Sequence, residues 1–301
     1  AHAHAVAHRD HAERARARTD AFTAIPLKDA TFSAAFPVEQ DVVQSRNVFA
    51  RIPGAERPDE TVMIAAHWDA YGIGAPDAQG RTVRSGANDD ALGLAAMFEI
   101  ARAFKAGPQP DRSVVFAAWT AEERGLLGSE YYALNPIYPL ETTVANLTVD
   151  VLQTAGLARD VILIGEGQNT LEDDLARFAK AQGRTVTPDS APERGLFYRA
   201  DHFSLAKRGV PVLLMMGLGG GADLVEGGRE AGEAWVAEYT KNRYHTPGDR
   251  WDESWNLAGA VQDIDLVWDI ARDLAFSERW PTWKEGSEFK DVRQESAEAR
   301  Q

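Results

Sequence analysis

The sequence predicts an α/β fold in which helices cover a central sheet. From Arg46 onward, short apolar runs alternate with segments whose apolar residues recur at helical spacing, which is typical of this fold class. A length of 301 residues suits one large domain. The composition, with 44% hydrophobic and 26% charged residues, is that of a globular protein and excludes a disordered or fibrous chain.

Six short apolar runs are predicted to be strands. In chain order they are Asn47–Ile52, Val62–Ala66, Ser113–Trp119, Ala145–Val151, Val161–Ile164 and Val210–Met216. Longer segments with an apolar side at helical spacing are predicted to be helices. These are Ala91–Lys105, Leu171–Gln182 and the closing helix Asn256–Phe276.

Three regions differ in composition. We expect residues 1–25 to form an N-terminal helical segment, 26–283 the main domain, and 284–301 a charged, solvated C-terminal tail. The first twenty residues hold four of the seven histidines, but alanine alternates there with charged residues, which favours a solvated terminal helix over a metal site. The glycine-rich segment Gly217–Gly228 lacks the Lys-Ser/Thr ending of a phosphate loop, so a mobile loop is predicted instead.

Charge and cysteine content limit the partners and the chemistry. The 32 basic and 46 acidic residues leave a net charge of −14, which argues against a nucleic-acid partner. With no cysteine, thiolate metal sites, disulfides and cysteine nucleophiles are excluded, so any metal must use His, Asp and Glu. Apolar runs such as Val210–Met216 are far shorter than the roughly 20 residues of a membrane span, which predicts a soluble protein.

Polar residues follow two of the predicted strands. His67 and Asp69 come at the end of the run VMIAA and point to the same side of an extended chain, as a ligand and its orienting carboxylate would. An ordinary hydrogen-bonded turn explains this pair equally well. Glu122 and Glu123 end the run SVVFAAW, where a metal ligand and a proton shuttle could lie, although adjacent glutamates are usually solvated surface charge.

Three further sites carry candidate ligands. Asp89 and Asp90 precede a helix, and a helix N-cap explains one aspartate but not a buried pair. Asp150 interrupts an apolar strand, where a carboxylate needs a partner or a cation. His245 stands before a Pro-Gly turn and is an ordinary loop residue or a ligand, with Asp249 able to orient its ring.

The order HWD, SGANDDALG, TAEERGLLGS, TVD and YHTPGD resembles the co-catalytic dizinc aminopeptidase family. Its superfamily also includes glutamate carboxypeptidases, glutaminyl cyclases and the transferrin receptor. The resemblance extends over roughly Ser45 to Ala275. It implies a single three-layer αβα domain of the zinc-exopeptidase type, with a central mixed, mostly parallel sheet.

The resemblance also implies two zinc ions per chain and the residues that hold them. The implied ligands are His67, Asp89, Glu123, Asp150 and His245, with Asp89 bridging the two ions. Family members commonly have a cis peptide after the bridging aspartate, so we expect one between Asp89 and Asp90. Ala70 and Ala200 depart from serines that are frequent in the family, and neither position is a ligand.

Further roles follow from the same resemblance. Glu122 is implied to be the general base, and Asp69 the carboxylate that orients His67. The Tyr244 hydroxyl is expected to polarise the scissile carbonyl, unless it is a buried packing tyrosine. A matching segment places three more residues near the substrate, namely Arg199, Asp201 and His202.

The implied function is a zinc aminopeptidase that acts on peptides. The alternatives are carboxypeptidase or glutaminyl-cyclase activity on the same scaffold, and an inactive, receptor-like binding domain. A periplasmic or secreted location is expected, with any signal peptide absent from this sequence, and the oligomeric state stays open.

Overall fold

The computed structural model describes residues 31–38 and 41–300, and its compact unit is Gln44–Gln301. Ala1–Val43 form a separate unit, in which the described residues, 31–38 and 41–43, are exposed and form no helix or strand. The predicted N-terminal segment 1–25 lies outside the described residues.

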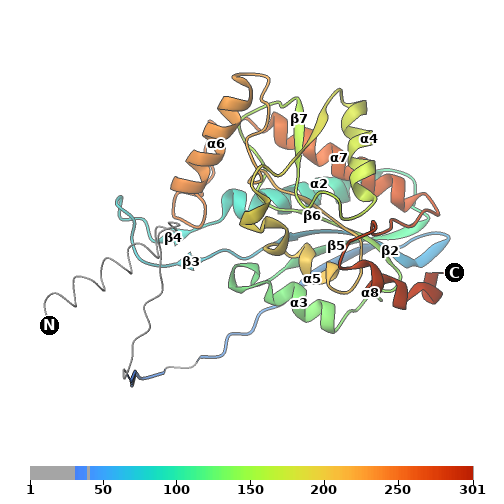
Figure 1. The fold of residues 1–301 in the computed structure, drawn as a ribbon, viewed down its shortest axis with the longest axis horizontal. Helices are drawn as coiled ribbons and strands as arrows, with labels where there is room; N and C mark the ends of the chain where they lie inside the picture. Colours follow the sequence, from blue (N-terminus) through green and yellow to red (C-terminus); the bar gives the residue numbers. More distant parts are fainter. Residues whose placement is uncertain (1–30, 39–40, 301) are drawn as a thin grey trace, which may run out of the picture. The chain divides into compact units, whose positions relative to one another are not determined.

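A five-stranded mixed sheet forms the centre of the Gln44–Gln301 unit (Figure 1). Its order is β1 (Val48–Ile52), β5 (Arg112–Trp119), β2 (Arg57–His67), β6 (Thr143–Val149) and β9 (Val212–Met215). β1 runs antiparallel to β5, with Val48 opposite Ala118, and the other neighbours are parallel. The predicted fold class, with a mixed and mostly parallel sheet, is therefore confirmed.

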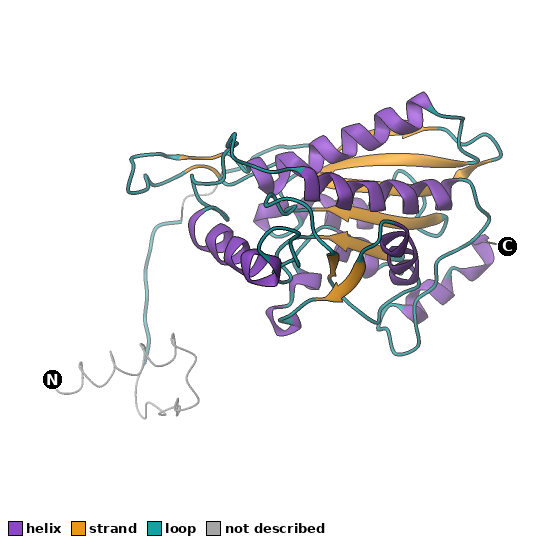
Figure 2. Ribbon diagram, turned by 90° about the horizontal axis from the view of Figure 1, so that it is seen from above, coloured by secondary structure: helices purple, strands orange, loops and turns teal. Residues whose placement is uncertain are grey.

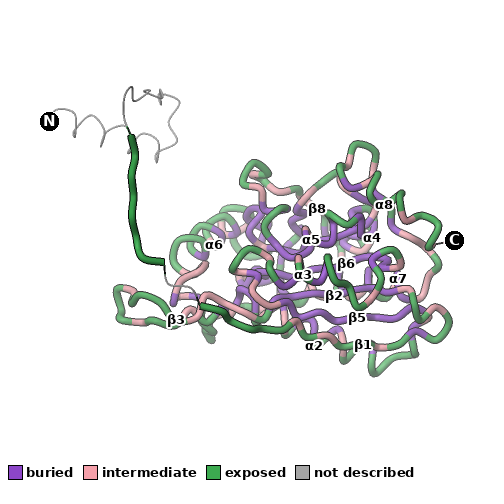
Figure 3. Tube along the Cα trace, turned by 90° about the horizontal axis from the view of Figure 1, so that it is seen from below, coloured by how far each residue is buried: buried purple, intermediate pink, exposed green. Residues whose placement is uncertain are grey.

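Helices cover both faces of this sheet, as Figure 2 shows. Alternate residues of β2 face opposite sides, so Val62 and Ile64 join one buried cluster while Met63 and Ala65 join another. The first cluster packs against α2 (Leu92–Ala106), α4 (Leu171–Ala181) and α7 (Ala258–Ala275). The second includes residues of α3 (Leu127–Leu134), α5 (His202–Ala206) and α6 (Gly228–Asn242). Figure 3 shows the buried strands between these layers.

Shorter elements surround the central sheet. β3 (Gly72–Ile73) and β4 (Val83–Arg84) pair as an antiparallel hairpin. The predicted strand Val161–Ile164 appears as β7 (Asp160–Leu163), but it pairs with β8 (Thr185–Pro188) in a separate two-stranded sheet. Short helical segments complete the unit, namely η1 (Ala87–Ala91), η2 (Glu122–Arg124), η3 (Pro192–Arg194), η4 (Leu196–Tyr198) and η5 (Ala297–Arg300). Among the helices that the structure describes, none combines the length and the apolar character that crossing a membrane requires.

The C-terminal segment is packed onto the domain, contrary to the expectation of a solvated tail. It contains α8 (Lys290–Glu295), and the Phe289 and Arg293 side chains are buried. The Arg293 guanidinium donates hydrogen bonds to the carbonyl oxygens of Leu140, at 3.0 Å, and Thr143, at 2.8 Å. Because Leu140 lies just before β6 and Thr143 is its first residue, the segment covers one end of the sheet.

The glycine-rich segment Gly217–Gly228 is a loop up to the start of α6, as its composition predicted. It lies against the domain core, because Leu218 and Leu224 are buried. Its glycines allow close packing: a side chain on Gly221 would lie 2.1 Å from the backbone nitrogen of Glu233 in α6.

Candidate metal centre

The candidate ligands gather at the carboxyl ends of three adjacent parallel strands. His67 is the last residue of β2, Asp150 follows β6 directly, and Glu123 lies in η2 just after β5. Open α/β sheets collect ligand-binding residues at this edge, because the loops that leave the strands meet there. Asp89 reaches the same place from η1, at the start of α2, and His245 comes from the loop after α6.

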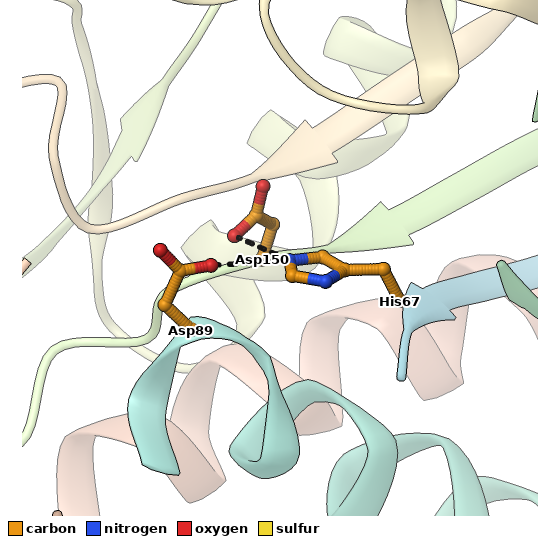
Figure 4. Close-up of side chains that lie close together, drawn as sticks. All are labelled: His67, Asp89 and Asp150. Atoms are coloured by element: carbon orange, nitrogen blue, oxygen red, sulfur yellow. Dashed lines mark hydrogen bonds and ion pairs between the residues drawn. The ribbon is translucent and has the colours of Figure 1, made fainter. Parts of the chain in front are cut away.

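All five predicted ligands come together, in two groups that share Asp89. In the first group, drawn in Figure 4, His67 Nε2 lies 3.1 Å from Asp89 Oδ1 and 4.0 Å from Asp150 Oδ1. In the second group, His245 Nε2 lies 3.2 Å from Asp89 Oδ2 and 3.1 Å from Glu123 Oε2. The two oxygens of Asp89 thus face different groups, as a bridging carboxylate requires.

The donors in these groups fit two divalent cations. Imidazole nitrogens and carboxylate oxygens are ligands that zinc accepts, and each group offers three of them. The buried Asp89 Oδ2 receives no hydrogen bond from the described residues, although His245 Nε2 is nearby. Crowded carboxylates at low exposure are costly without compensating positive charge, which a pair of cations would supply.

The electrostatics of the carboxylates agree with this fit. Burial and then the charge of Asp89 raise the pKa of Asp150 to about 7. The same two causes raise the pKa of Glu123 to about 8. Without a cation nearby, these groups would hold protons near neutral pH, whereas a bound cation favours their ionised, ligating forms.

Asp69 connects the first histidine with the two glutamates. Its Oδ1 lies 3.6 Å from His67 Nδ1, and its backbone oxygen lies 3.1 Å from the same nitrogen. Its carboxylate also accepts hydrogen bonds from the backbone N–H groups of Glu122, at 3.0 Å, and Glu123, at 3.3 Å. One side chain therefore contacts the ring of His67 and holds the turn that carries both glutamates.

Asn88 and Asp249 hold the Asp89 loop, and the sequence did not single out these roles. The Asn88 amide donates to the Leu152 carbonyl at 2.9 Å and accepts from the Leu152 N–H at 3.1 Å. The Asp249 carboxylate accepts from the backbone N–H groups of Asn88, at 3.1 Å, and Asp89, at 3.0 Å. The suggestion that Asp249 orients His245 is thus wrong, because its carboxylate holds this loop instead. The polar string SGAND was the only sequence signal for Asn88.

Unusual backbone conformations surround the ligands. Within the described residues, four non-glycine residues have positive φ, namely Ala121 (54°), Leu126 (61°), Val151 (49°) and His245 (58°). Ala121 and Val151 lie next to the candidate residues Glu122 and Asp150, His245 is itself a candidate ligand, and Leu126 lies three residues after Glu123. Such conformations cost of order 1–3 kcal/mol each and persist where the surrounding structure imposes them, which is common at functional sites. The peptide bond between Asp89 and Asp90 is cis, as predicted.

A cavity of about 380 Å³ opens onto both groups. Glu122 lines it, and burial together with the charge of Asp150 raises the pKa of this carboxyl group well above its usual range. Arg199 and Tyr244 also line the cavity, and Arg199 Nη2 lies 3.4 Å from the Tyr244 hydroxyl. Asp201 and His202 are buried and are not among its lining residues, so their contact with a substrate stays a prediction.

Comparison with known proteins identifies a matching family and similar sequences. The sequence profile of Peptidase family M28 matches residues 47–268. Leupeptin-inactivating enzyme 1 of Streptomyces exfoliatus is 29% identical over 187 residues, which are 62% of this chain and 38% of that protein. A probable zinc metalloprotease of Pyrenophora teres f. teres (strain 0-1) is 38% identical over 91 residues, 30% of this chain and 19% of that protein. The chain therefore spans well under two thirds of the length of these relatives.

Solved structures share the fold. BSAP, a zinc aminopeptidase from Bacillus subtilis, superposes with a TM-score of 0.57 at 23% identity, covering 81% of this chain and 52% of that one. A peptidase M28 precursor from Shewanella amazonensis SB2B gives a TM-score of 0.54 at 24% identity, covering 78% of this chain and 45% of that one.

Proposed function

The chain belongs to Peptidase family M28, and on this premise we propose that it is a zinc-dependent aminopeptidase that hydrolyses the N-terminal peptide bond of peptides. The observation that carries the proposal is the sharing of Asp89 between two ligand groups beside a cavity that Glu122 also lines. Such a site combines cation ligands with a carboxylate that is able to move a proton.

Two zinc ions fit the proposed site. One would be held by His67, Asp89 and Asp150, and the other by Asp89, Glu123 and His245. When bound, such ions lower the pKa of a water molecule from about 15.7 towards about 7 and polarise a carbonyl oxygen.

Glu122 acts as the proton carrier in this proposal. Its carboxylate takes the proton from the attacking water and returns it to the leaving amine. Burial raises the pKa of this carboxyl group above that of an exposed glutamate, and two bound cations would lower it again towards neutrality, where one carboxyl group can both accept and release a proton. Asp69 keeps Glu122 in place through the backbone N–H of Glu122.

The other cavity residues orient the peptide. The Tyr244 hydroxyl donates a hydrogen bond to the carbonyl oxygen as negative charge develops on it. The acidic groups around Glu122 and Asp150 attract the free ammonium group of the peptide. Arg199 supports the Tyr244 hydroxyl, whose oxygen is within reach of its guanidinium.

Arg199 also favours carboxypeptidase activity as the second candidate. A guanidinium that lines the cavity could pair with the C-terminal carboxylate of a peptide. A glutaminyl cyclase is less consistent with the site, because the cyclases of this superfamily use one zinc ion and two ligand groups are present. An inactive binding domain is also disfavoured, since every ligand position holds a competent residue. The periplasmic or secreted location stays a prediction.

The proposal is tested by measuring bound zinc and hydrolysis on the same purified protein. We expect two zinc ions per chain, hydrolysis of aminoacyl anilides, and loss of activity with a chelator that zinc then restores. Peptides with a blocked amino terminus should resist hydrolysis, whereas cleavage of these peptides from their carboxyl end would favour the second candidate. Metal-free protein that remains active would exclude both.

Glu122→Gln tests the role of the base. We expect it to retain zinc and to lose about 10²–10⁴-fold in kcat, the usual contribution of a general base. Glu99→Gln is the matched control, because Glu99 is exposed on α2 and pairs with Arg102 at the surface, away from the cavity. Wild-type kcat in Glu122→Gln would show that another group carries the proton.

A further inference from the structure

We propose that Tyr71 is a positioning residue that holds the His245 ring in its ligating orientation and thereby sets the zinc affinity of the Asp89, Glu123 and His245 group. The inference rests on the proposed metal site and adds a residue to it. Tyr71 lies outside the ligand motifs of the sequence.

The two ligand histidines are held in different ways. His67 Nδ1 lies near the backbone oxygen and the carboxylate of Asp69, so polar atoms orient its ring. His245 makes no hydrogen bond through Nδ1 to any residue in the described part of the chain, and only Nε2 faces the carboxylates. A metal-binding histidine usually needs a second contact to fix its ring, because free rotation lowers affinity.

Aromatic rings provide that contact for His245. The Tyr244 ring stacks on the imidazole with centroids 3.7 Å apart and planes inclined by 28°. The Tyr71 ring lies 4.5 Å from the imidazole, inclined by 46°. Both tyrosines also line the cavity.

Of these two tyrosines, Tyr71 is the one that connects the His245 ring to a separate ligand-bearing loop. Tyr244 precedes His245 in the chain and moves with it, whereas Tyr71 comes from the connection between β2 and β3, two residues after Asp69. Tyr71 in turn contacts the loop of the glutamates, because the Arg124 guanidinium lies 5.4 Å from its ring centroid. The Tyr71 ring therefore contacts residues on two other loops that carry ligands.

The backbone at His245 increases the need for such a contact. Its φ of 58° is unfavourable for a side chain with a Cβ, and 27% of the side chain is exposed. A half-buried histidine on a strained loop has other conformations available, and the adjacent Tyr71 ring, 4.5 Å away, would restrict them. Because contacts of this kind act by packing, the phenyl ring of Tyr71 is the active part and its hydroxyl is dispensable.

Zinc affinity in two single-site backgrounds tests the inference. Asp150→Asn weakens the first group and leaves Glu123 and His245, while Glu123→Gln weakens the second and leaves His67 and Asp150. We expect Tyr71→Leu to lower zinc affinity about 10–100-fold in the Asp150→Asn background, the usual effect of losing an orienting contact. In the Glu123→Gln background Tyr71→Leu should change affinity less than about threefold, and Tyr71→Phe should keep the affinity of the parent protein in both backgrounds. Competition with a chromophoric chelator measures each constant.

Matched controls separate this role from a general structural one. Tyr198→Leu removes another tyrosine that lines the cavity, but its ring contacts only Phe197 and Phe203 among the described aromatic side chains. It should leave zinc affinity unchanged, and circular dichroism of the metal-free variants should confirm that they fold. If a background variant does not fold, the titration is repeated with all ligands present, where Tyr71→Leu should weaken only one of two binding steps.

Several outcomes would overturn the inference. Equal losses in both backgrounds would indicate a general effect on folding, and no loss in either would show that Tyr71 is not needed. A loss in Tyr71→Phe as large as in Tyr71→Leu would assign the role to the hydroxyl. If wild-type protein bound no zinc at all, the proposed function itself would fail, which the same titration distinguishes.

Discussion

Single buried carboxylates perform different tasks around the candidate centre. Asp89 and Asp150 face the histidines, whereas the Asp249 carboxylate accepts hydrogen bonds from backbone N–H groups. Its Oδ2 accepts hydrogen bonds from the Asp89 N–H, at 3.0 Å, and from the Tyr239 hydroxyl, at 3.2 Å. Asp249 is almost fully buried, so these N–H and O–H donors stabilise its carboxylate in place of the hydrogen bonds that water would provide.

We expect Asp249→Asn to lower the free energy of unfolding by about 1–3 kcal/mol, because a charged acceptor is replaced by an amide whose NH₂ group cannot accept these N–H donors. Urea denaturation of the metal-free protein measures the change. Asp265→Asn, on the exposed side of α7, should stay within about 0.5 kcal/mol of wild type. An equally small change at Asp249 would mean that the Asp89 loop is held by its other contacts.

At the scale of elements, the start of α2 is shaped by the adjacent aspartates. Asp90 is fully buried, and its carboxylate accepts hydrogen bonds from the backbone N–H groups of His67, at 3.0 Å, and Gly93, at 3.2 Å. A side chain on Gly93 would place its Cβ 2.2 Å from Asp90 Oδ1. The first turn of α2 therefore needs glycine, although glycine is a poor helix former.

Gly93→Ala should destabilise the protein by about 1–3 kcal/mol through overpacking, even though alanine improves helix propensity by about 1 kcal/mol. Ala95→Gly, at an exposed position of the same helix, isolates the propensity effect and should cost about 1 kcal/mol. Thermal unfolding by calorimetry measures both variants. A stabilised Gly93→Ala variant would show that Asp90 can move aside.

At the scale of the whole molecule, buried titratable groups make folding depend on pH. His202 is fully buried, with the Phe197 ring packed edge-on at 4.9 Å, and burial lowers the pKa of its imidazole to about 3. In the unfolded chain the pKa is near 6.5. Between pH 6.5 and 3 the unfolded state binds more protons, so this group lowers stability as the pH falls through that range.

The free energy of unfolding should therefore fall by about 2 kcal/mol more in wild type than in His202→Gln between pH 7 and pH 5. Both proteins share every other titrating group, so the difference between the two urea-denaturation profiles isolates His202. Parallel profiles would mean that His202 is protonated in the folded state or exposed to water.

Much of the architecture could be predicted from local sequence. Five of the six predicted strands lie in the central sheet, because short apolar runs bury both faces of a parallel sheet. The predicted strand Val161–Ile164 formed but pairs only with β8, since pairing partners depend on tertiary packing. The burial of Phe289 and Arg293 was missed for a similar reason. A charged segment is expected to be solvated, and only the folded structure shows that Arg293 donates a hydrogen bond to the carbonyl oxygen of Thr143.

The ligand types and their order along the chain were determined by the sequence alone. His67, Asp89, Glu123, Asp150 and His245 stand at strand ends or in loops whose composition is informative by itself. Only the tertiary structure decided how they are supported: that Asp89 faces two groups, that Asp249 holds the Asp89 loop, and that Tyr71 reaches His245. The physical reason is that the type of a residue limits which bonds its own side chain can make. Which distant segments it contacts is decided only when the sheet and its helices pack together.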